Sequence, residues 1–260
     1  GNFISRVSAQ SSVIAPLSIT KALQLNPSIR RAAVFYAQDD AYSTAETVIF
    51  QQALTAKGLK PVTVQRTQLN DQDFQSQITA ALNQKPDLVV LSLQAMDGGN
   101  LIRQLRELGY RGAIVVGNGM NTPNIYPICQ RYCDGILIAQ AYSPELATPA
   151  NQRFTAAFAA AQARNPKVSP IPPQLTAQAY TAMQVIGEAL ARLDRSQPLK
   201  GLPLAQARKA LMAEILAGTY QTPLGEIRFT PEGEVIQKNF FVAKVRMNPD
   251  GKSGRFTLLP

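Results

Sequence analysis

The chain has 260 residues, of which 45% are hydrophobic and 17% are charged, so it can bury a sizeable core in one or two domains. No apolar run reaches the ~18 residues of a membrane span, which predicts a soluble globular chain. The formal net charge is +9, but like charges form no run of five or more, and aromatic residues do not alternate with Lys and Arg. We therefore expect no nucleic-acid partner, and we interpret the charge as a solvated surface or as an aid in collecting an anionic ligand.

Residue types needed for common catalytic and metal sites are missing. The chain contains no histidine, which excludes Ser-His-Asp and Cys-His catalysis and every His-containing zinc site. An Asp pair, Asp39 and Asp40, could hold Mg²⁺, but no phosphate-binding glycine loop accompanies it. We expect a protein that is not an enzyme, with no catalytic residue, no metal and no cofactor.

The two cysteines, Cys129 and Cys133, are four residues apart, a spacing that places side chains on one face of a helix. Two thiols alone cannot close a zinc site. Either they form a local disulfide in an oxidising compartment, or they are two reduced and buried thiols.

The first 140 residues alternate between short apolar runs and amphipathic stretches. The apolar runs predict strands at residues 32–36, 61–66, 87–93, 113–116 and 136–139. The stretches between them predict helices of about 10–15 residues. In the first of these, Ser43 and Glu46 have the spacing of a capping box, and an apolar stripe follows at Val48, Ile49, Ala53 and Ala56. The alternation predicts an α/β fold with a parallel sheet flanked by helices.

Three of the predicted strands end in a short polar loop. The loops are residues 38–42, 94–97 and 117–121. Because the carboxyl ends of parallel strands meet at one edge of a sheet, these loops should lie side by side, where a small ligand normally binds.

The pattern changes after residue 149. Helices are predicted up to residue 217, interrupted by a proline-rich loop at 165–173, and strands follow at 225–230, 239–246 and 255–258. The helices have wide apolar stripes but no strands of their own to cover. Either they form an all-α subdomain, or the sheet on which they pack lies outside this sequence.

Seven segments together carry a family resemblance: residues 31–36, 39–42, 74–82, 85–90, 103–109, 133–136 and 222–233. In their order and spacing they resemble type I periplasmic substrate-binding proteins, most closely the leucine/isoleucine/valine-binding branch of ABC importers. The resemblance implies a periplasmic-binding-protein type I fold, in which two α/β lobes joined by three crossovers close on a ligand.

The resemblance also implies a division of the chain. Residues 1–8, 139–144 and 219–223 would be the three crossovers. We expect residues 1–140 and 219–260 to form the second ligand-binding lobe, and residues 141–218 to be the helical remainder of a first lobe whose N-terminal part is missing.

The function implied is that of a non-enzymatic solute-binding protein of an ABC importer. It would close around a small polar ligand (an amino acid, an amide or an organic acid) and deliver it to a membrane permease. The protein would be exported to the periplasm or the cell exterior and be a monomer when complete. The alternative is an extracellular ligand-sensing domain of a receptor or regulator with the same fold.

Several ligand contacts follow from the resemblance. Tyr42 matches a tyrosine after the family's first strand, Gln94 falls where a second aromatic is common, and Gly119 falls where an acidic residue binds the ligand's ammonium. The further candidates are Ser92, Ala95, Asn118, Met120 and Ser8.

Each candidate also has a purely structural interpretation. Tyr42 could cap a helix start, Asp39 and Asp40 could hold their loop through backbone N–H groups, and residues 118–120 could be a turn. Because a buried ammonium without a carboxylate is costly, we expect a ligand that need not be an α-amino acid. Asp97 is the alternative acidic residue.

Overall fold

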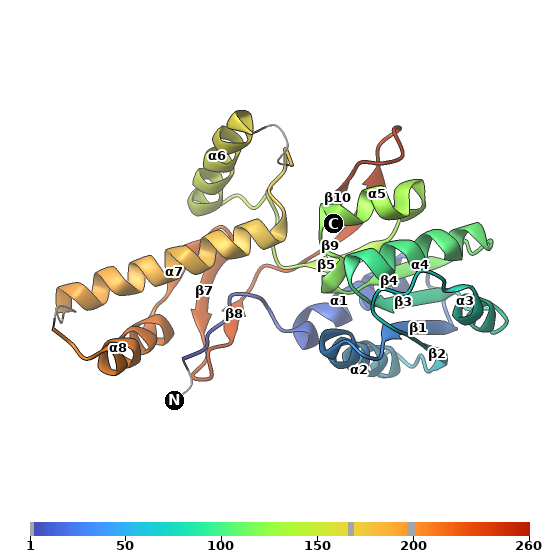
Figure 1. The fold of residues 1–260 in the computed structure, drawn as a ribbon, viewed down its shortest axis with the longest axis horizontal. Helices are drawn as coiled ribbons and strands as arrows, with labels where there is room; N and C mark the ends of the chain where they lie inside the picture. The colour runs from blue at the N-terminus through green and yellow to red at the C-terminus, as the bar shows by residue number, and fades with distance from the viewer. Residues whose placement is uncertain (1–2, 166–168, 197–200) are drawn as a thin grey trace. The chain divides into compact units, whose positions relative to one another are not determined.

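The computed structural model describes residues 3–165, 169–196 and 201–260 (Figure 1). The chain divides into two compact units. We call Ser11–Gln140 with Phe241–Pro260 the sheet unit, and Gly1–Gln10 with Ala141–Phe240 the helix unit. Residues 1–2 of the predicted first crossover and residues 166–168 of the predicted proline-rich loop lie outside the described ranges.

The sheet unit is built on a seven-stranded sheet of order β10-β9-β5-β4-β3-β1-β2 (Figure 1). Strands β1 to β5 are parallel, whereas β9 and β10 are antiparallel to their neighbours. The strands are β1 (Ala32–Ala37), β2 (Pro61–Thr67), β3 (Leu88–Ser92), β4 (Ala113–Val116), β5 (Leu137–Gln140), β9 (Phe241–Met247) and β10 (Gly254–Leu258). The predicted α/β fold with a parallel sheet is confirmed.

Helices cover both faces of this sheet because alternate residues of its strands point to opposite sides. On one face Val34 and Val90 pack against α1 (Ser11–Leu25) and α2 (Ala41–Ala56). On the other, Phe35 and Leu91 belong to a core with α3 (Gln75–Leu82), α4 (Ala95–Glu107) and α5 (Tyr126–Cys129). Short 3₁₀ turns lie at Asn118–Met120 (η1), Pro123–Ile125 (η2) and Gln130–Cys133 (η3).

The buried face of α2 differs from the predicted stripe. Phe50, Ala53 and Leu54 are buried against the sheet, while Val48 is 51% exposed. Glu46, which precedes Phe50 by four residues, lies on the buried face as well. The true stripe is thus rotated around the helix, and it contains a carboxylate.

The strand order reverses direction at β1, which pairs with β2 on one side and β3 on the other. The connection from β1 runs through α2 on one face, and the connection into β3 runs through α3 on the opposite face. After β3 the chain continues into α4, on the face opposite α2, so it leaves the carboxyl ends of β1 and β3 in opposite directions. This is the position in the topology at which α/β proteins bind ligands.

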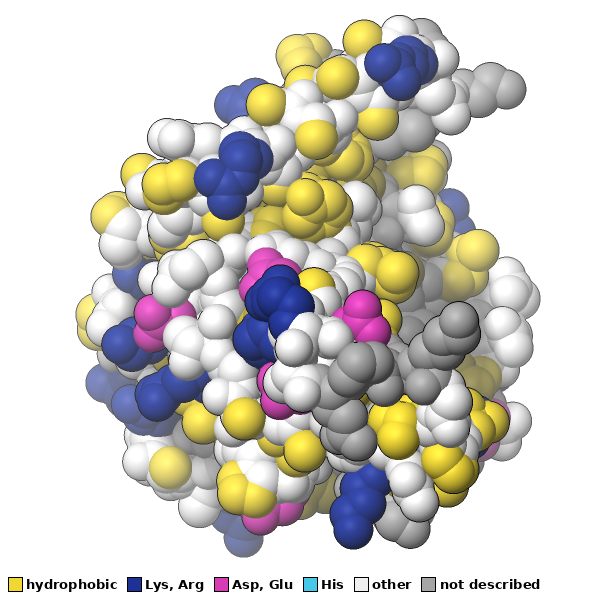
Figure 2. Space-filling view, turned by 90° about the vertical axis from the view of Figure 1, so that its left-hand side faces the viewer, with side chains coloured by type: hydrophobic (Ala, Val, Ile, Leu, Met, Phe, Trp, Pro, Cys, Tyr) yellow, Lys and Arg dark blue, Asp and Glu magenta, His cyan; other side chains and the backbone are white. Residues whose placement is uncertain are grey.

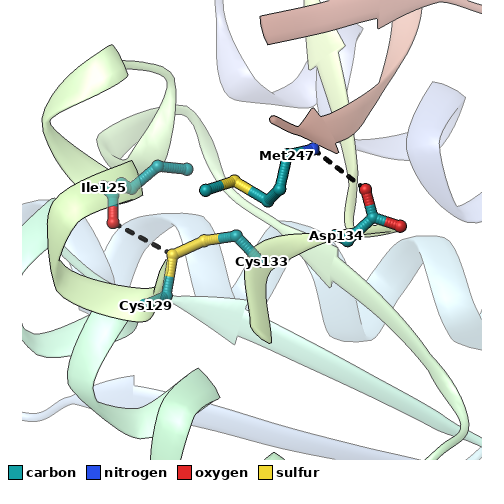
Figure 3. The surroundings of a disulfide bond; sticks show 5 residues. All are labelled: Ile125, Cys129, Cys133, Asp134 and Met247. Carbon is teal, nitrogen blue, oxygen red and sulfur yellow. Dashed lines mark hydrogen bonds between the residues drawn. A yellow bond between two sulfur atoms is a disulfide. The ribbon is translucent and has the colours of Figure 1, made fainter. Parts of the chain in front are cut away.

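The cysteine pair forms a disulfide between Cys129 and Cys133, with Cα atoms 5.4 Å apart (Figure 3). The two residues are not on one continuous helix, because Gln130 has a positive φ of 51° and separates α5 from η3. The Cys129 sulfur lies 3.0 Å from the Ile125 carbonyl oxygen. This is a close contact, since a disulfide sulfur carries no hydrogen. The disulfide was one of the two predicted alternatives and is confirmed.

Over its described residues, the helix unit combines three helices with a small antiparallel sheet of order β6-β7-β8. Its core includes Tyr142, Phe154 and Tyr220. Its elements are α6 (Pro149–Arg164), α7 (Gln174–Ser196), α8 (Leu204–Ala217), β6 (Tyr220–Thr222), β7 (Gly225–Phe229) and β8 (Val235–Gln237).

The predicted division of the chain was wrong for residues 219–240. These residues belong to the helix unit, because β6, β7 and β8 pair with one another and bury Tyr220 and Ile227 beside residues of α7 and α8. Only residues 241–260 join the large sheet. The start of the chain also lies in the helix unit, where Arg6 forms an isolated parallel bridge with Glu234. The third crossover, where the chain last connects the two units, is thus at residues 240–241 and not at the predicted residues 219–223.

One side of α7 remains apolar and open. Leu175 is 70% exposed and Met183 is 69% exposed. Figure 2 shows that hydrophobic side chains are exposed on the face of the molecule that it presents. Next to them an apolar groove of about 370 Å³ lies between residues 5–8 and α7. Within the described ranges, no helix combines the length and apolar character required to cross a lipid bilayer.

Candidate functional site

The site is built from the loops that follow β1, β3 and β4, which we call the carboxyl edge (residues 38–42, 93–97 and 117–121). The loop after β1 begins α2 with Asp40 as the N-cap. Its carboxylate accepts hydrogen bonds from the Ser43 N–H at 3.2 Å and the Tyr42 N–H at 3.4 Å, and from the Ser43 hydroxyl at 2.9 Å. The predicted capping box of Ser43 and Glu46 was wrong, because Asp40 occupies the cap position and Glu46 turns into the interior.

Asp40 also connects the first loop to the second. The Gln94 side-chain N–H donates to its carboxylate at 3.0 Å, so the loops after β1 and β3 are hydrogen-bonded to each other. Although partial burial acts in the opposite direction, hydrogen bonds from Ser43, Gln94 and Tyr42 hold the pKa of Asp40 below its ordinary value. Asp40 is therefore an ionised structural group.

Tyr42 connects the first loop to the third. Its hydroxyl oxygen accepts a hydrogen bond from the Gly119 N–H at 2.6 Å, and the same hydroxyl is hydrogen-bonded to Glu46. Burial, with the nearby charge of Glu46, raises the pKa of Tyr42 far above its ordinary value, so the hydroxyl stays protonated. The structure thus brings Tyr42, Gln94 and Gly119 together, as the sequence predicts for the loops that carry them.

Gly119 is confined on several sides. A Cβ at this position would lie 2.6 Å from the Leu93 carbonyl oxygen, 2.8 Å from Cε1 of Tyr42 and 3.1 Å from the side-chain oxygen of Gln94. A larger side chain does not fit here while Tyr42 and Gln94 keep their positions. The Tyr42–Gly119 contact depends on glycine.

Glu46 was not among the predicted site residues, although it lies at the centre of the carboxyl edge. It is 2% exposed. Its carboxylate accepts hydrogen bonds from the Asn118 N–H and the Ser92 hydroxyl, each at 3.1 Å, and it is bonded to Tyr42 and Ser11. Burial raises the pKa of Glu46, although these hydrogen bonds act in the opposite direction.

The other predicted residues differ in their accessibility. Gln94, Ala95 and Asn118 are half-buried at the carboxyl edge. Ser92 and Met120 are fully buried. The Ser92 hydroxyl bonds to Ser43 and Glu46, and the Met120 side chain packs on Gly98 in the core.

Ser8 belongs to the helix unit, where it lines the apolar groove beside α7. It is therefore not part of the carboxyl edge as the sheet unit presents it.

Two acidic residues that could have bound a ligand bond to the backbone instead. Asp39 accepts from the Leu69 N–H at 2.9 Å, and Asp97 accepts from the Asn70 N–H at 3.2 Å. Asp97 is 2% exposed, and burial raises its pKa. Over the described residues, no cluster of three or more His, Cys, Asp and Glu side chains could hold a metal ion.

Several solved structures have the same fold as this chain. A leucine-binding protein, LivK, from Thermotoga maritima has a TM-score of 0.80 at 24% identity, over 97% of this chain and 66% of its own. An ABC transporter substrate-binding protein from Sphaerobacter thermophilus has a TM-score of 0.77 at 20% identity, over 96% and 64%. A solute-binding protein from R. palustris in complex with benzoate has a TM-score of 0.76 at 18% identity, over 98% and 64%.

The chain therefore spans about two thirds of the length of these structures. None of the curated proteins is a significant match to the sequence. A family model described as periplasmic binding protein matches residues 9–253. This match runs through both units and includes all three loops of the carboxyl edge, and the chain belongs to the periplasmic binding protein family.

Proposed function

We propose that the chain is the larger part of a non-enzymatic solute-binding protein that supplies an ABC importer. The observation that carries this proposal is the convergence of the loops after β1, β3 and β4 around Tyr42, Gln94 and Gly119 at the reversal point of the sheet. Family membership supports it, and two of the structural relatives named above, from Sphaerobacter thermophilus and R. palustris, are described as binding proteins of ABC transporters.

In this proposal the ligand contacts come from the accessible groups of the carboxyl edge. They are the ring of Tyr42, the amide of Gln94, and the residues Ala95, Asn118 and Gly119. Ser92 and Met120 act behind them, because both are fully buried. Ser8, which lies in the helix unit, remains a proposed contact from the sequence alone.

The ligand class in this proposal is a small polar compound that need not be an α-amino acid. An acidic side chain at position 119 would overlap Tyr42 and the Leu93 carbonyl. The nearby carboxylates of Asp40, Glu46 and Asp97 already accept hydrogen bonds from the protein. The relatives illustrate the range, since one is named as leucine-binding and another is in complex with benzoate.

We also propose that the helix unit is part of a larger lobe. The exposed apolar side of α7 and the groove next to it are typical of a helix that packs on a sheet. The buried Gln178 side chain lines this groove, and its amide nitrogen has no hydrogen-bond partner. Strands from residues outside this sequence would cover α7 and provide that partner.

The complete protein in this proposal is exported, remains a monomer and docks on a membrane permease. The test is a titration of the full-length protein by calorimetry with L-leucine, L-glutamate, benzoate and acetamide. Binding of at least one compound with 1:1 stoichiometry and without turnover is the expected result. Conversion of a bound compound, or no binding across these classes, would overturn the proposal.

A further inference from the structure

The carboxylate of Glu46 is buried without a cationic partner. None of the ion pairs found among the described residues includes it. A buried carboxylate is costly unless hydrogen bonds compensate for the lost water. Here they come from Ser11 at the start of α1, Tyr42 in the first turn of α2, Ser92 at the end of β3, and the Asn118 N–H.

These donors overlap with the proposed ligand contacts. Glu46 bonds to Tyr42 and to Asn118, and Tyr42 in turn accepts from the N–H of Gly119, the residue after Asn118. These contacts form a closed hydrogen-bond network that joins the first turn of α2 to the loop after β4.

Another glycine, Gly117, leaves room for this hydrogen-bond network. A Cβ at Gly117 would overlap the carboxylate of Glu46. The chain thus places a glycine next to the buried acid and a second one, Gly119, against Tyr42. Substitution at Gly117 would push the carboxylate away from Asn118.

We propose that Glu46 is a positioning residue of the ligand site, which fixes the Tyr42 ring and the Asn118–Gly119 backbone in the geometry that receives the ligand. Glu46 is itself too buried to touch a ligand and acts through these two groups. The inference rests on the proposed function, but its first two tests need no ligand.

The first test is hydrogen–deuterium exchange of the segment 117–121 in the full-length protein without ligand. In Glu46→Ala the exchange of this segment, relative to that of β4, should be at least about tenfold faster, as expected when hydrogen bonds to a charged group are lost. The control is Thr47→Ala, a buried polar residue of the same helix. Equal exchange in the two variants would overturn the proposal.

The second test uses the isosteric variant Glu46→Gln, which keeps the volume and one acceptor oxygen but removes the charge. The amide oxygen can still accept from the Asn118 N–H, so exchange of residues 117–121 should return most of the way to that of the unchanged protein. The ¹³Cζ resonance of Tyr42, assigned with Tyr42→Phe, should shift in Glu46→Gln and stay in place in Thr47→Ala. An unmoved Tyr42 resonance would overturn the proposal even if Glu46→Ala fails to fold.

The third test separates this inference from the proposed function. L-leucine and benzoate are titrated into the unchanged protein, Glu46→Ala and Thr47→Ala. If either compound binds, its affinity should fall about tenfold or more in Glu46→Ala only. Faster exchange with unchanged affinity would refute the positioning role and leave the proposed function intact. If neither compound binds, that result counts against the proposed ligand class, and the exchange and resonance tests still decide whether Glu46 fixes the loop.

Discussion

Gly119 provides the sharpest mutational prediction because its surroundings exclude even one methyl group. In Gly119→Ala the new carbon would lie 2.6 Å from the Leu93 carbonyl oxygen and 2.8 Å from the Tyr42 ring, so the backbone or the ring must move. Overpacking of this kind costs about 1–3 kcal/mol, and weakening the 2.6 Å hydrogen bond from Gly119 to Tyr42 costs about 1 kcal/mol more. The free energy of unfolding should therefore fall by about 2–4 kcal/mol, which lowers the thermal midpoint by roughly 4–16 °C for a unit of this size.

The assay is thermal and urea unfolding of the full-length protein, with Gln52→Ala as the control. Gln52 is exposed on α2, in the same unit as Gly119. This exposed substitution should change the free energy of unfolding by less than about 0.5 kcal/mol. If Gly119→Ala is as stable as the unchanged protein, Tyr42 does not pack closely enough against residue 119 to exclude an acidic side chain there.

Three further predictions concern stability. The double variant Cys129→Ala/Cys133→Ala loses a disulfide across a separation of four residues, and the thermal midpoint should fall by roughly 4–8 °C, since closing so short a loop contributes about 2 kcal/mol. A reducing agent should lower the midpoint of the unchanged protein by a similar amount, and no change in either case would contradict a structural role. Burial raises the pKa of Glu46 above its ordinary value of 4.5, so the folded state binds the carboxyl proton of Glu46 more tightly than the unfolded state does. The free energy of unfolding should therefore decline as the pH rises from about 4.5 through the pKa of Glu46 in the folded state. Urea unfolding between pH 4 and 8 should show a smaller decline in the free energy of unfolding for Glu46→Gln than for the unchanged protein. If the two proteins lose stability in parallel, burial does not raise the pKa of Glu46. Tyr220→Phe removes a hydroxyl that donates to the Ile215 carbonyl, at the end of α8, at 3.0 Å. The free energy of unfolding measured in urea should fall by about 1–2 kcal/mol. The control is Tyr180→Phe, which removes the hydroxyl of an exposed tyrosine and should leave stability unchanged.

The parallel sheet, and the meeting of the three loops that form the candidate site, could be predicted from the sequence because both depend on local patterns. Short apolar runs such as 32–36 and 113–116 identify buried strands, and polar loops after them identify the carboxyl edge. Asp40 was correctly interpreted as a residue that holds its loop. Its cap is a local contact, with Tyr42 and Ser43 only two and three residues away.

Glu46 could not be predicted in the same way, because its partners come from four separate elements. One local signal was available. Glu46 has the spacing of Phe50 and Ala53 on a single helical stripe, and a lone acid within an apolar stripe indicates a buried, partnered carboxylate. The prediction missed this signal because it placed the buried stripe through Val48 and Ile49, which leaves Glu46 outside it.

The division of the chain was mispredicted for a similar reason. Residues 219–240 and 241–260 both have the alternation of antiparallel strands, and alternation does not specify which sheet a strand joins. Their strand pairing assigns the two segments to different sheets, since β6 pairs with β7 whereas β9 pairs with β5.

The central claim is that this protein binds a small polar ligand at the carboxyl edge through Tyr42. The most direct measurement is calorimetric titration of the full-length protein and its Tyr42→Ala variant with the compound that binds best among L-leucine, L-glutamate, benzoate and acetamide. Tyr132→Ala, in the same unit but at η3, is the matched control. We predict that Kd rises about tenfold or more in Tyr42→Ala and by less than about twofold in Tyr132→Ala. Equal affinities in all three proteins, or no binding by the unchanged protein, would contradict the claim.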